Sequence, residues 1–285
     1  MNKSERIKTG LVLEGGAMRG MYTAAVLDVF LDQGIRFDAI AGVSAGALFG
    51  VNFLSGQKGR VIRYNKKYNR DRKYMGLLPL LKEGNIVSTE YAYHRVPEKL
   101  DPFDNETYMC SDTDFYAVLT NVKTGMPEYV KITDVFRQMD TLRASGSLPF
   151  VSRPVEIDGE SYLDGGISDS IPYEFLRKKL GCSRLVVILT RDLAYRKKPS
   201  SPKLIHLLSR KMPAIEQRML VRHETYNKAV EKLCEMEKRG EVFIIRPSEP
   251  IEIGRLEKDP SKLQAVYDLG RKDALEQIEN LREYL

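Results

Sequence analysis

The sequence predicts an α/β protein of three layers (α/β/α), in which helices cover both faces of a mainly parallel central sheet. Within residues 9–54, an apolar run, a glycine-rich loop, a helix-like run, a second apolar run and another helix-like run follow one another. Such units build parallel sheets, with ligands at the carboxyl ends of the strands. A later apolar run, residues 184–190, is typical of one more buried parallel strand.

The first unit is defined by where its apolar runs begin and end. The elements expected in it are a strand over residues 9–14, a glycine-rich loop over 15–20, a helix over 21–30, a strand over 37–43 and a helix over 45–54. Apolar residues at helical spacing mark the first helix, and Gly34 ends it. Because parallel strands bring their carboxyl ends to one edge of the sheet, the loop and Ser44 are expected to lie close together.

The rest of the chain continues this alternation less regularly. The elements expected there are a strand over 114–120 paired with 128–131, a helix over 132–144, a hairpin over 155–163 that turns at Asp158 and Gly159, a strand over 184–190, a helix over 213–239, a strand over 241–245 and a helix over 261–285. No internal repeat, low-complexity tract or linker divides them. Residues 1–285 are therefore predicted as a single domain, with core motifs over about 9–190 and a helical C-terminal elaboration over about 200–285.

The composition is that of a globular protein in a reducing compartment. Of the 285 residues, 42% are hydrophobic and 29% are charged. No apolar run reaches the roughly 18 residues that span a bilayer, and the polar stretch Met1–Lys8 leads directly into a strand, so neither an anchor nor a secretory signal is expected. Cys110, Cys182 and Cys234 are widely spaced and form no CxxC pair, which indicates reduced thiols. We predict a cytoplasmic protein that can also be peripheral to a membrane.

The net charge of +6 favours anionic partners. No zinc-finger, RRM or basic-zipper pattern is present, so nucleic acid is not expected, and no clustered carboxylates predict a metal or other cofactor. Residues 58–73 are strongly basic, with Tyr64, Tyr68 and Tyr74 interleaved. Such a charge run is usually a solvated helix face. The alternative is a patch that meets anionic lipid, with tyrosines at headgroup level. The candidate residues for this contact are Lys66, Lys67, Arg70 and Arg72.

The segment Gly42-Val43-Ser44-Ala45-Gly46 has the pattern Gly-x-Ser-x-Gly between an expected strand and an expected helix. A serine at such a turn is held in strained backbone geometry, with its Oγ exposed and the free N–H groups of the next helix beside it. Glycines on either side leave room for the turn and for a substrate carbonyl. Five residues alone are equally compatible with a tight turn that carries an incidental serine.

The glycine-rich loop Gly15–Gly20 admits two interpretations. As a dinucleotide fingerprint it lacks the middle glycine, because Ala17 stands there, and the acidic candidate Asp38 lies at the start of the second strand rather than at its end. As an oxyanion hole, its small residues leave backbone N–H groups free to bind the oxyanion that forms when Ser44 attacks an ester, and Arg19 adds a positive charge. The nearby serine favours the oxyanion hole.

A third motif, Asp164-Gly165-Gly166, follows the expected hairpin. Alone, it is typical of a β-turn. In this order, however, the three motifs and the segment Ala144–Pro149 resemble the patatin-like phospholipase family, particularly its bacterial members. The resemblance covers roughly residues 9–190. It implies a patatin-like fold and a Ser44–Asp164 catalytic dyad, without histidine, that hydrolyses acyl esters of lipids.

The resemblance also implies a role for each motif residue. Ser44 would be the nucleophile, and Asp164 would accept its proton, return it to the leaving alcohol and then help water to hydrolyse the acyl-enzyme. A carboxylate is a poorer base than imidazole, so burial or hydrogen bonding must tune it. The implied oxyanion hole comprises Gly15, Gly16, Ala17 and Arg19. The supporting motif residues are Gly20, Gly42, Gly46, Gly165 and Gly166.

The sequence departs from the family at Ala17, where a third glycine is usual. If this position needs φ > 0, alanine would be strained by about one kcal/mol, although its N–H would remain. One alternative is therefore a catalytically weak acyl-lipid-binding protein, and a transacylase is another. A third is an α/β-hydrolase with a Ser-Asp-His triad completed by His206 or His223. Both histidines lie in basic, helix-like segments, where solvated or core histidines are more common.

Overall fold

The structure, a computed structural model, describes residues 7–285, so most of the polar stretch Met1–Lys8 lies outside the described residues. The described chain forms one eight-stranded sheet in the order β5-β6-β3-β2-β1-β7-β8, with β4 paired to β3. The strands are β1 (Thr9–Leu13), β2 (Ala39–Val43), β3 (Asp114–Asn121), β4 (Pro127–Ile132), β5 (Val155–Ile157), β6 (Glu160–Asp164), β7 (Arg184–Ile188) and β8 (Val242–Ile245).

The sheet is parallel on one side and antiparallel on the other. Strands β8, β7, β1, β2 and β3 run parallel to one another, as predicted for β1, β2 and β7. Strands β4 and β6 each pair with β3 in the antiparallel sense, and β5 pairs with β6, also in the antiparallel sense. The β5–β6 hairpin turns at Asp158 and Gly159, which have φ of 51° and 84°, so the predicted turn is confirmed.

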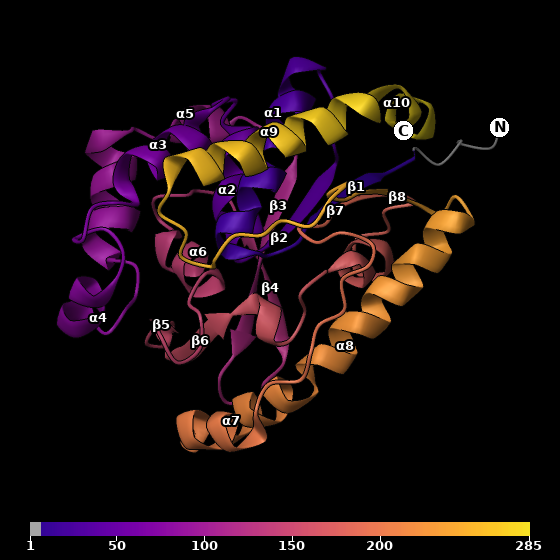
Figure 1. The fold of residues 1–285 in the computed structure, drawn as a ribbon. Helices are drawn as coiled ribbons and strands as arrows, with labels where there is room; N and C mark the ends of the chain where they lie inside the picture. The colour runs from indigo at the N-terminus through magenta and orange to yellow at the C-terminus, as the bar shows by residue number, and fades with distance from the viewer. Residues whose placement is uncertain (1–6) are drawn as a thin grey trace.

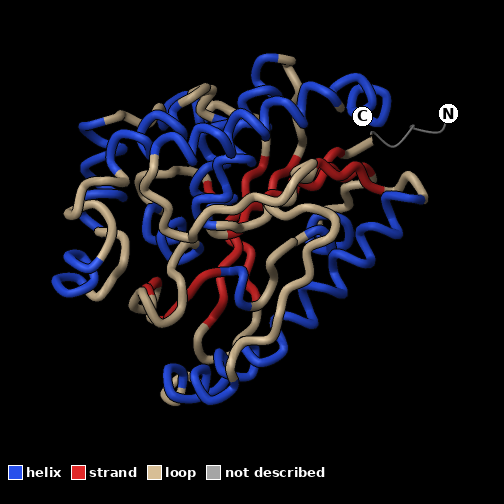
Figure 2. Tube along the Cα trace, in the orientation of Figure 1, coloured by secondary structure: helices blue, strands red, loops and turns tan. Residues whose placement is uncertain are grey.

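Helices cover both faces of this sheet and give the three predicted layers (Figure 1). The helices are α1 (Met21–Asp32), α2 (Ala45–Leu54), α3 (Arg60–Tyr68), α4 (Leu77–Glu83), η2 (Thr89–Leu100), α5 (Asn105–Met109), α6 (Met139–Ser145), η4 (Phe175–Lys179), α7 (Pro202–Ser209), α8 (Pro213–Lys238), α9 (Pro260–Glu276) and α10 (Ile278–Tyr284). One face packs mainly against α1, α2 and α9, and the other packs against η4 and α8. Figure 2 shows the strands between these two layers.

The C-terminal part of the chain completes the layers. Strand β8 extends the sheet beyond β7, and α9 lies along α1 (Figure 1). Gly270 allows this close approach, because a Cβ there would lie 2.6 Å from the carbonyl oxygen of Tyr22. The Tyr22 hydroxyl donates to Asp273 Oδ2 at 3.0 Å, and both groups are buried. The single domain over 1–285 stays a prediction, and these contacts between early and late segments favour it.

Two predicted helices have other bounds. The helix predicted over 132–144 begins only at Met139, because β4 runs to Ile132 and the Gln138 side chain accepts the N–H groups of Thr133 and Asp134 in a turn. The helix predicted over 261–285 is divided at Gln277 into α9 and α10. Within the described residues, no helix combines the length and apolar character needed to cross a membrane.

The tyrosines of the basic stretch 58–73 are not at the surface. Tyr68 and Tyr74 are 7% exposed and pack with Met75 and Val96, while Tyr64 packs partly buried against the same cluster. The prediction that these rings stand at headgroup level is therefore wrong. Helix α3 is strongly amphipathic, so its aromatic residues face the protein, together with the buried Arg60, while Arg63, Lys66 and Lys67 face solvent.

Candidate active site

Ser44 occupies the sharp turn between β2 and α2. Its backbone has φ 55° and ψ −122°, the strained geometry that the sequence predicts for an exposed nucleophile. The two flanking glycines leave no space for side chains. A Cβ on Gly42 would lie 2.7 Å from the carbonyl oxygen of Gly46, and a Cβ on Gly46 would collide with the carbonyl oxygen of Leu13. The turn is therefore pressed between its own helix and the end of β1.

The glycine-rich loop lies directly against this turn. A Cβ on Gly15 would lie 2.9 Å from the Cβ of Ser44, and one on Gly16 would lie 2.6 Å from Thr190 Oγ1. Ala17 has φ 49°, so the condition for strain stated above is met. Within the described chain, the N–H groups of Gly15, Gly16 and Ala17 donate no hydrogen bond. Three backbone donors beside the serine are thus free to bind a ligand oxygen.

Asp164 ends β6 and is 3% exposed. Its Oδ1 accepts the Gly166 N–H at 2.7 Å. Burial raises the pKa of the carboxyl group above its ordinary value, while the Ser44 hydroxyl and the charge of Arg222 act in the opposite direction. Oδ2 is buried, and no group of the described residues makes a hydrogen bond of normal geometry to it. The Ser44 hydroxyl therefore lies near enough to act on the carboxylate, although no hydrogen bond joins the two groups among the described residues.

A family model described as patatin-like phospholipase matches residues 11–177. The chain belongs to the patatin-like phospholipase family. A second model, described as a domain of unknown function (DUF6363), matches residues 212–285. The family assignment made from the three motifs and their order is confirmed.

Relatives of this patatin-like chain include proteins with and without a named activity. The uncharacterized protein YjjU of Escherichia coli (strain K12) is 29% identical over 276 residues, which cover 93% of this chain and 75% of YjjU. Lysophospholipase NTE1 of Saccharomyces cerevisiae is 27% identical over 187 residues, which cover 63% of this chain and 10% of NTE1. The crystal structure of VipD from Legionella pneumophila has a TM-score of 0.47 and 13% identity, over 96% of this chain and 67% of that chain.

Ser145 is a site residue that sequence reasoning missed. The segment Ala144–Pro149 carries part of the resemblance, but its sequence predicts no role for either of its serines. The Oγ of Ser145 instead accepts the N–H of Ser44 at 3.0 Å and donates to the carbonyl oxygen of Val118 at 2.8 Å. Two residues later, the carbonyl oxygen of Ser147 accepts the N–H of Asp164 at 2.9 Å. One short segment therefore fixes both halves of the predicted dyad.

A cavity of about 150 Å³ opens beside Ser44 in this patatin-like domain. Ala17 and Met18 line it at the serine, and apolar side chains of α2, η2 and α6 line most of the remainder. Residues that precede and follow α4 in the sequence, including Met75 and Ile86, also line the cavity. The cavity therefore joins the serine to an apolar space suited to a hydrocarbon chain.

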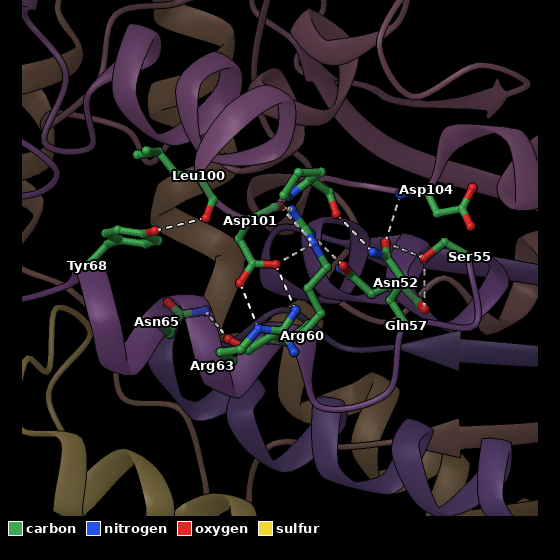
Figure 3. Close-up of polar contacts among 12 residues, drawn as sticks. Asn52, Ser55, Gln57, Arg60, Arg63, Asn65, Tyr68, Leu100, Asp101 and Asp104 are labelled. Carbon is green, nitrogen blue, oxygen red and sulfur yellow. Dashed lines mark hydrogen bonds and ion pairs between the residues drawn. The ribbon is translucent and has the colours of Figure 1, made fainter.

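One wall of the cavity contains the buried guanidinium of Arg60. Its Nε donates to the carbonyl oxygen of Asp101 at 3.1 Å, and its Nη1 donates to Asn52 Oδ1 at 2.7 Å. Arg63 makes two further bonds of 2.8 Å to the Asp101 carboxylate. Figure 3 shows both arginines converging on Asp101. Because these charges are already paired, they close the wall of the cavity rather than await a ligand.

The other predicted site residues divide into two groups. Gly20 packs against Ala45 and Phe49, and Gly165 packs against the carbonyl oxygen of Val118. At both positions, the missing side chain allows neighbouring segments to lie close together. Arg19 is not in the cavity lining; its guanidinium lies near Glu14, Arg191 and Tyr195. The structure therefore brings the Arg19 charge close to the loop without a contact to Ser44.

The histidines lie apart from the serine. His206 is on α7, with its side chain 73% exposed and its Nδ1 2.9 Å from Glu216. His223 is on α8 and lies near Glu224. Neither they nor His94 hydrogen-bonds to Ser44 or Asp164, and all three belong to the described residues. The geometry gives no support to the Ser-Asp-His alternative.

Replacing Ser44 by glycine should yield a more stable protein than replacing it by alanine. Both variants lack the hydroxyl, but only glycine adopts φ 55° and ψ −122° without steric cost. Relief of the backbone strain should raise the free energy of unfolding by about 1–3 kcal/mol. The greater conformational entropy of glycine in the unfolded chain lowers it by only about 0.5–1 kcal/mol. Urea unfolding measures the difference. At Ser55, where φ is −78°, the same pair should show no advantage for glycine; an equal response at both positions would refute strain at Ser44.

Ser145→Ala should reduce the reactivity of Ser44 as well as stability. The change leaves the buried N–H of Ser44 without its acceptor, at a cost of about 1–3 kcal/mol. The turn then moves, and we expect labelling by a fluorophosphonate to slow by roughly tenfold. Ser209→Ala removes another buried hydroxyl that donates to a backbone carbonyl, far along the chain in α7, and serves as the control. Equal labelling rates in the two variants would show that Ser145 does not position the nucleophile.

Proposed function

We propose that the protein is a lipid acyl hydrolase of the phospholipase A, lysophospholipase or esterase type. Membership of the patatin-like phospholipase family supports a lipid hydrolase. The finer assignment rests on one observation above all: the Ser44 hydroxyl lies beside a buried carboxylate and free backbone N–H groups, at an apolar cavity. The name of the fungal relative, a lysophospholipase, points in the same direction.

In the proposed mechanism, Asp164 is the general base and Ser44 is the nucleophile. The serine Oγ forms a bond to the ester carbonyl carbon while its proton passes to the carboxylate. The tetrahedral oxyanion accepts hydrogen bonds from the N–H groups of Gly15, Gly16 and Ala17, next to the positive end of α2. Asp164 then protonates the leaving alcohol. A water molecule, activated by the same carboxylate, hydrolyses the acyl-enzyme and restores Ser44.

Burial makes Asp164 a better base than an exposed aspartate. A carboxyl group whose pKa is raised holds a proton more strongly and can take one from serine at a lower free-energy cost. The charge of Arg222 opposes this rise in the pKa and favours the ionised form of the carboxyl group. This balance supports a dyad that works without histidine. Transacylation would use the same acyl-enzyme, and analysis of products with an added alcohol acceptor would distinguish it from hydrolysis.

The hydrolysis of p-nitrophenyl butyrate tests the proposal. Ser44→Ala and Asp164→Asn should each lower kcat/KM by roughly 1,000-fold or more, because each removes a group that acts in the transition state. The double variant His206→Ala/His223→Ala should retain full activity. If the histidine variant is folded but inactive, the dyad is wrong and a Ser-Asp-His triad carries out the reaction. If the wild type cleaves no ester, the weak acyl-lipid-binding alternative takes the place of the hydrolase.

We also propose that the protein contacts anionic membranes through Lys66, Lys67, Arg70 and Arg72, all of them exposed. The exposed side chains of Leu77 and Leu81 on α4 follow this basic stretch at once, with exposures of 74% and 84%. Basic and apolar groups side by side are typical of interfacial segments. Since residues on both sides of α4 border the cavity, such contact would bring the cavity to the lipid. The cytoplasmic location stays a proposal, and the three free cysteines agree with it.

Charge reversal of Lys66, Lys67, Arg70 and Arg72 to glutamate should abolish binding to vesicles that contain phosphatidylglycerol, because surface attraction contributes about 1 kcal/mol per basic residue. Flotation of the protein with vesicles measures the bound fraction. The control reverses four exposed lysines elsewhere, Lys179, Lys203, Lys228 and Lys238, and so has the same net charge. Equal loss in both variants would indicate an effect of total charge and would contradict a defined patch.

A further inference from the structure

A second group of charges surrounds the predicted dyad, and only one of its members, Arg222, has a role in the mechanism above. Five cationic side chains take part in it, and we call them the cationic cluster: Arg19, Arg191, Lys197, Arg222 and Arg255. Four of them lie outside residues 11–177, the part matched by the patatin-like model. Among the described residues, none of the five has a carboxylate within ion-pair distance. By contrast, the buried Arg60 and the partly buried Arg246 are each paired with a carboxylate. Within the cluster, Arg255 is exposed and the other four side chains are partly buried.

Arg222 and Arg255 lie closest to the predicted chemistry. Arg222 extends from α8, and its Nε donates to the carbonyl oxygen of Gly166 at 2.5 Å. Its Nη2 lies 3.2 Å from the point that a Cβ of Gly166 would occupy. Arg255 lines the same cavity as Ser44, and its carbonyl oxygen accepts the N–H of Met18 at 3.4 Å. Both charges act on the Asp164 carboxyl.

Lys197 is held in position, although none of residues 7–285 accepts a hydrogen bond from its amine. Its backbone N–H donates to Asn227 Oδ1 at 2.9 Å, and its carbonyl oxygen accepts from Asn227 Nδ2 at 3.0 Å. The Nζ lies 3.8 Å from the centre of the Tyr226 ring. Burial and the neighbouring Arg222 lower the pKa of Lys197 to about 7. The protein itself therefore provides little that stabilises this charge.

The remaining two cations, Arg191 and Arg19, also form no ion pair with a carboxylate in the part of the chain that the structure describes. Arg191 stacks on Tyr195, with its Cζ 4.1 Å from the ring centre. Arg19 has a buried Nε to which no hydrogen-bond acceptor of the described residues is close. Glu14 lies among these cations, but Tyr226 and the N–H of Thr190 already occupy its two oxygens. Mutual repulsion of five such charges favours a bound anion.

We propose that the cationic cluster binds a phosphate group, and that this phosphate belongs to the glycerol backbone of the ester that Ser44 cleaves. The inference rests on the proposed function and narrows its substrate to phosphorylated glycerolipids. Arginine pairs with phosphate through two parallel N–H···O bonds, which suits Arg222 and Arg255. In such lipids only a few covalent bonds separate the ester carbonyl from the phosphate. The acyl chain would fill the apolar cavity while the phosphate lies between α8 and the segment around Arg255.

The test compares two substrates that differ only in phosphate: a monoacylglycerol and the corresponding monoacylglycerol 3-phosphate. For the wild type, kcat/KM should be at least about tenfold higher with the phosphorylated ester, the factor expected from one charge-assisted contact. In the double variant Lys197→Met/Arg255→Met the ratio of the two values should fall close to one. Lys228→Met, an exposed position on α8, is the matched control and should keep the wild-type ratio.

The cationic cluster could also bind free phosphate rather than the phosphate of a lipid. A second experiment distinguishes these two ligands. Inorganic phosphate and glycerol 3-phosphate are added to the hydrolysis of p-nitrophenyl butyrate. Inhibition without any preference between the two lipids would show a site for free phosphate and would overturn the headgroup assignment. Absence of both effects would overturn the cluster as a phosphate site. If no ester is cleaved at all, the proposed function fails, and calorimetric titration of the protein with inorganic phosphate still decides whether the cluster binds it.

Discussion

The arrangement of the site depends on close contact between the Ser44 turn and the end of β1. A side chain on Gly46 would collide with the backbone of Leu13, and one on Gly15 would collide with Ser44 itself. The loop and the turn therefore have almost no freedom to move relative to each other. The free N–H groups of the loop are held next to the serine, and in the proposed mechanism they are the donors that an oxyanion would meet. Tight packing at glycines thus supplies the preorganisation of the site.

Local patterns in the sequence were sufficient for the parts of the site that are made by local structure. The Gly-x-Ser-x-Gly turn, the glycine-rich loop and the Asp164 turn each lie where a strand ends, so period and glycine content predict the turns themselves. Their grouping into one site follows instead from the resemblance to the patatin-like family. Ser145 could not be found in this way, since it meets Ser44 across 101 residues and has no local signature of its own. Arg222 could not be found from local patterns either, because only the packing of α8 brings it to Gly166. The tyrosines of α3 were misjudged because a charged composition concealed an amphipathic helix.

Opposing influences meet at Asp164. Burial favours the protonated carboxyl, and the nearby arginines favour the carboxylate. Two non-glycine residues with positive φ, Ala17 and Ser44, add steric strain at the same place. A region that combines strain, a buried carboxyl and unpaired cations is unfavourable for folding, and such combinations are found where function requires them. The chain offsets these terms through the large apolar core under α1 and α2.

The distance in sequence between α1 and its cover has a consequence for synthesis of the protein. Most of α1 is buried, yet the helix that covers it, α9, is translated long afterwards, and the Tyr22–Asp273 bond joins residues 251 positions apart. Strand β1 likewise pairs with β7, at the register Thr9↔Arg184. During translation, the apolar side chains of α1 therefore stay exposed to solvent until most of the chain has been synthesised. Nascent chains of this protein are expected to be natural clients of chaperones that hold exposed apolar segments until translation is nearly finished.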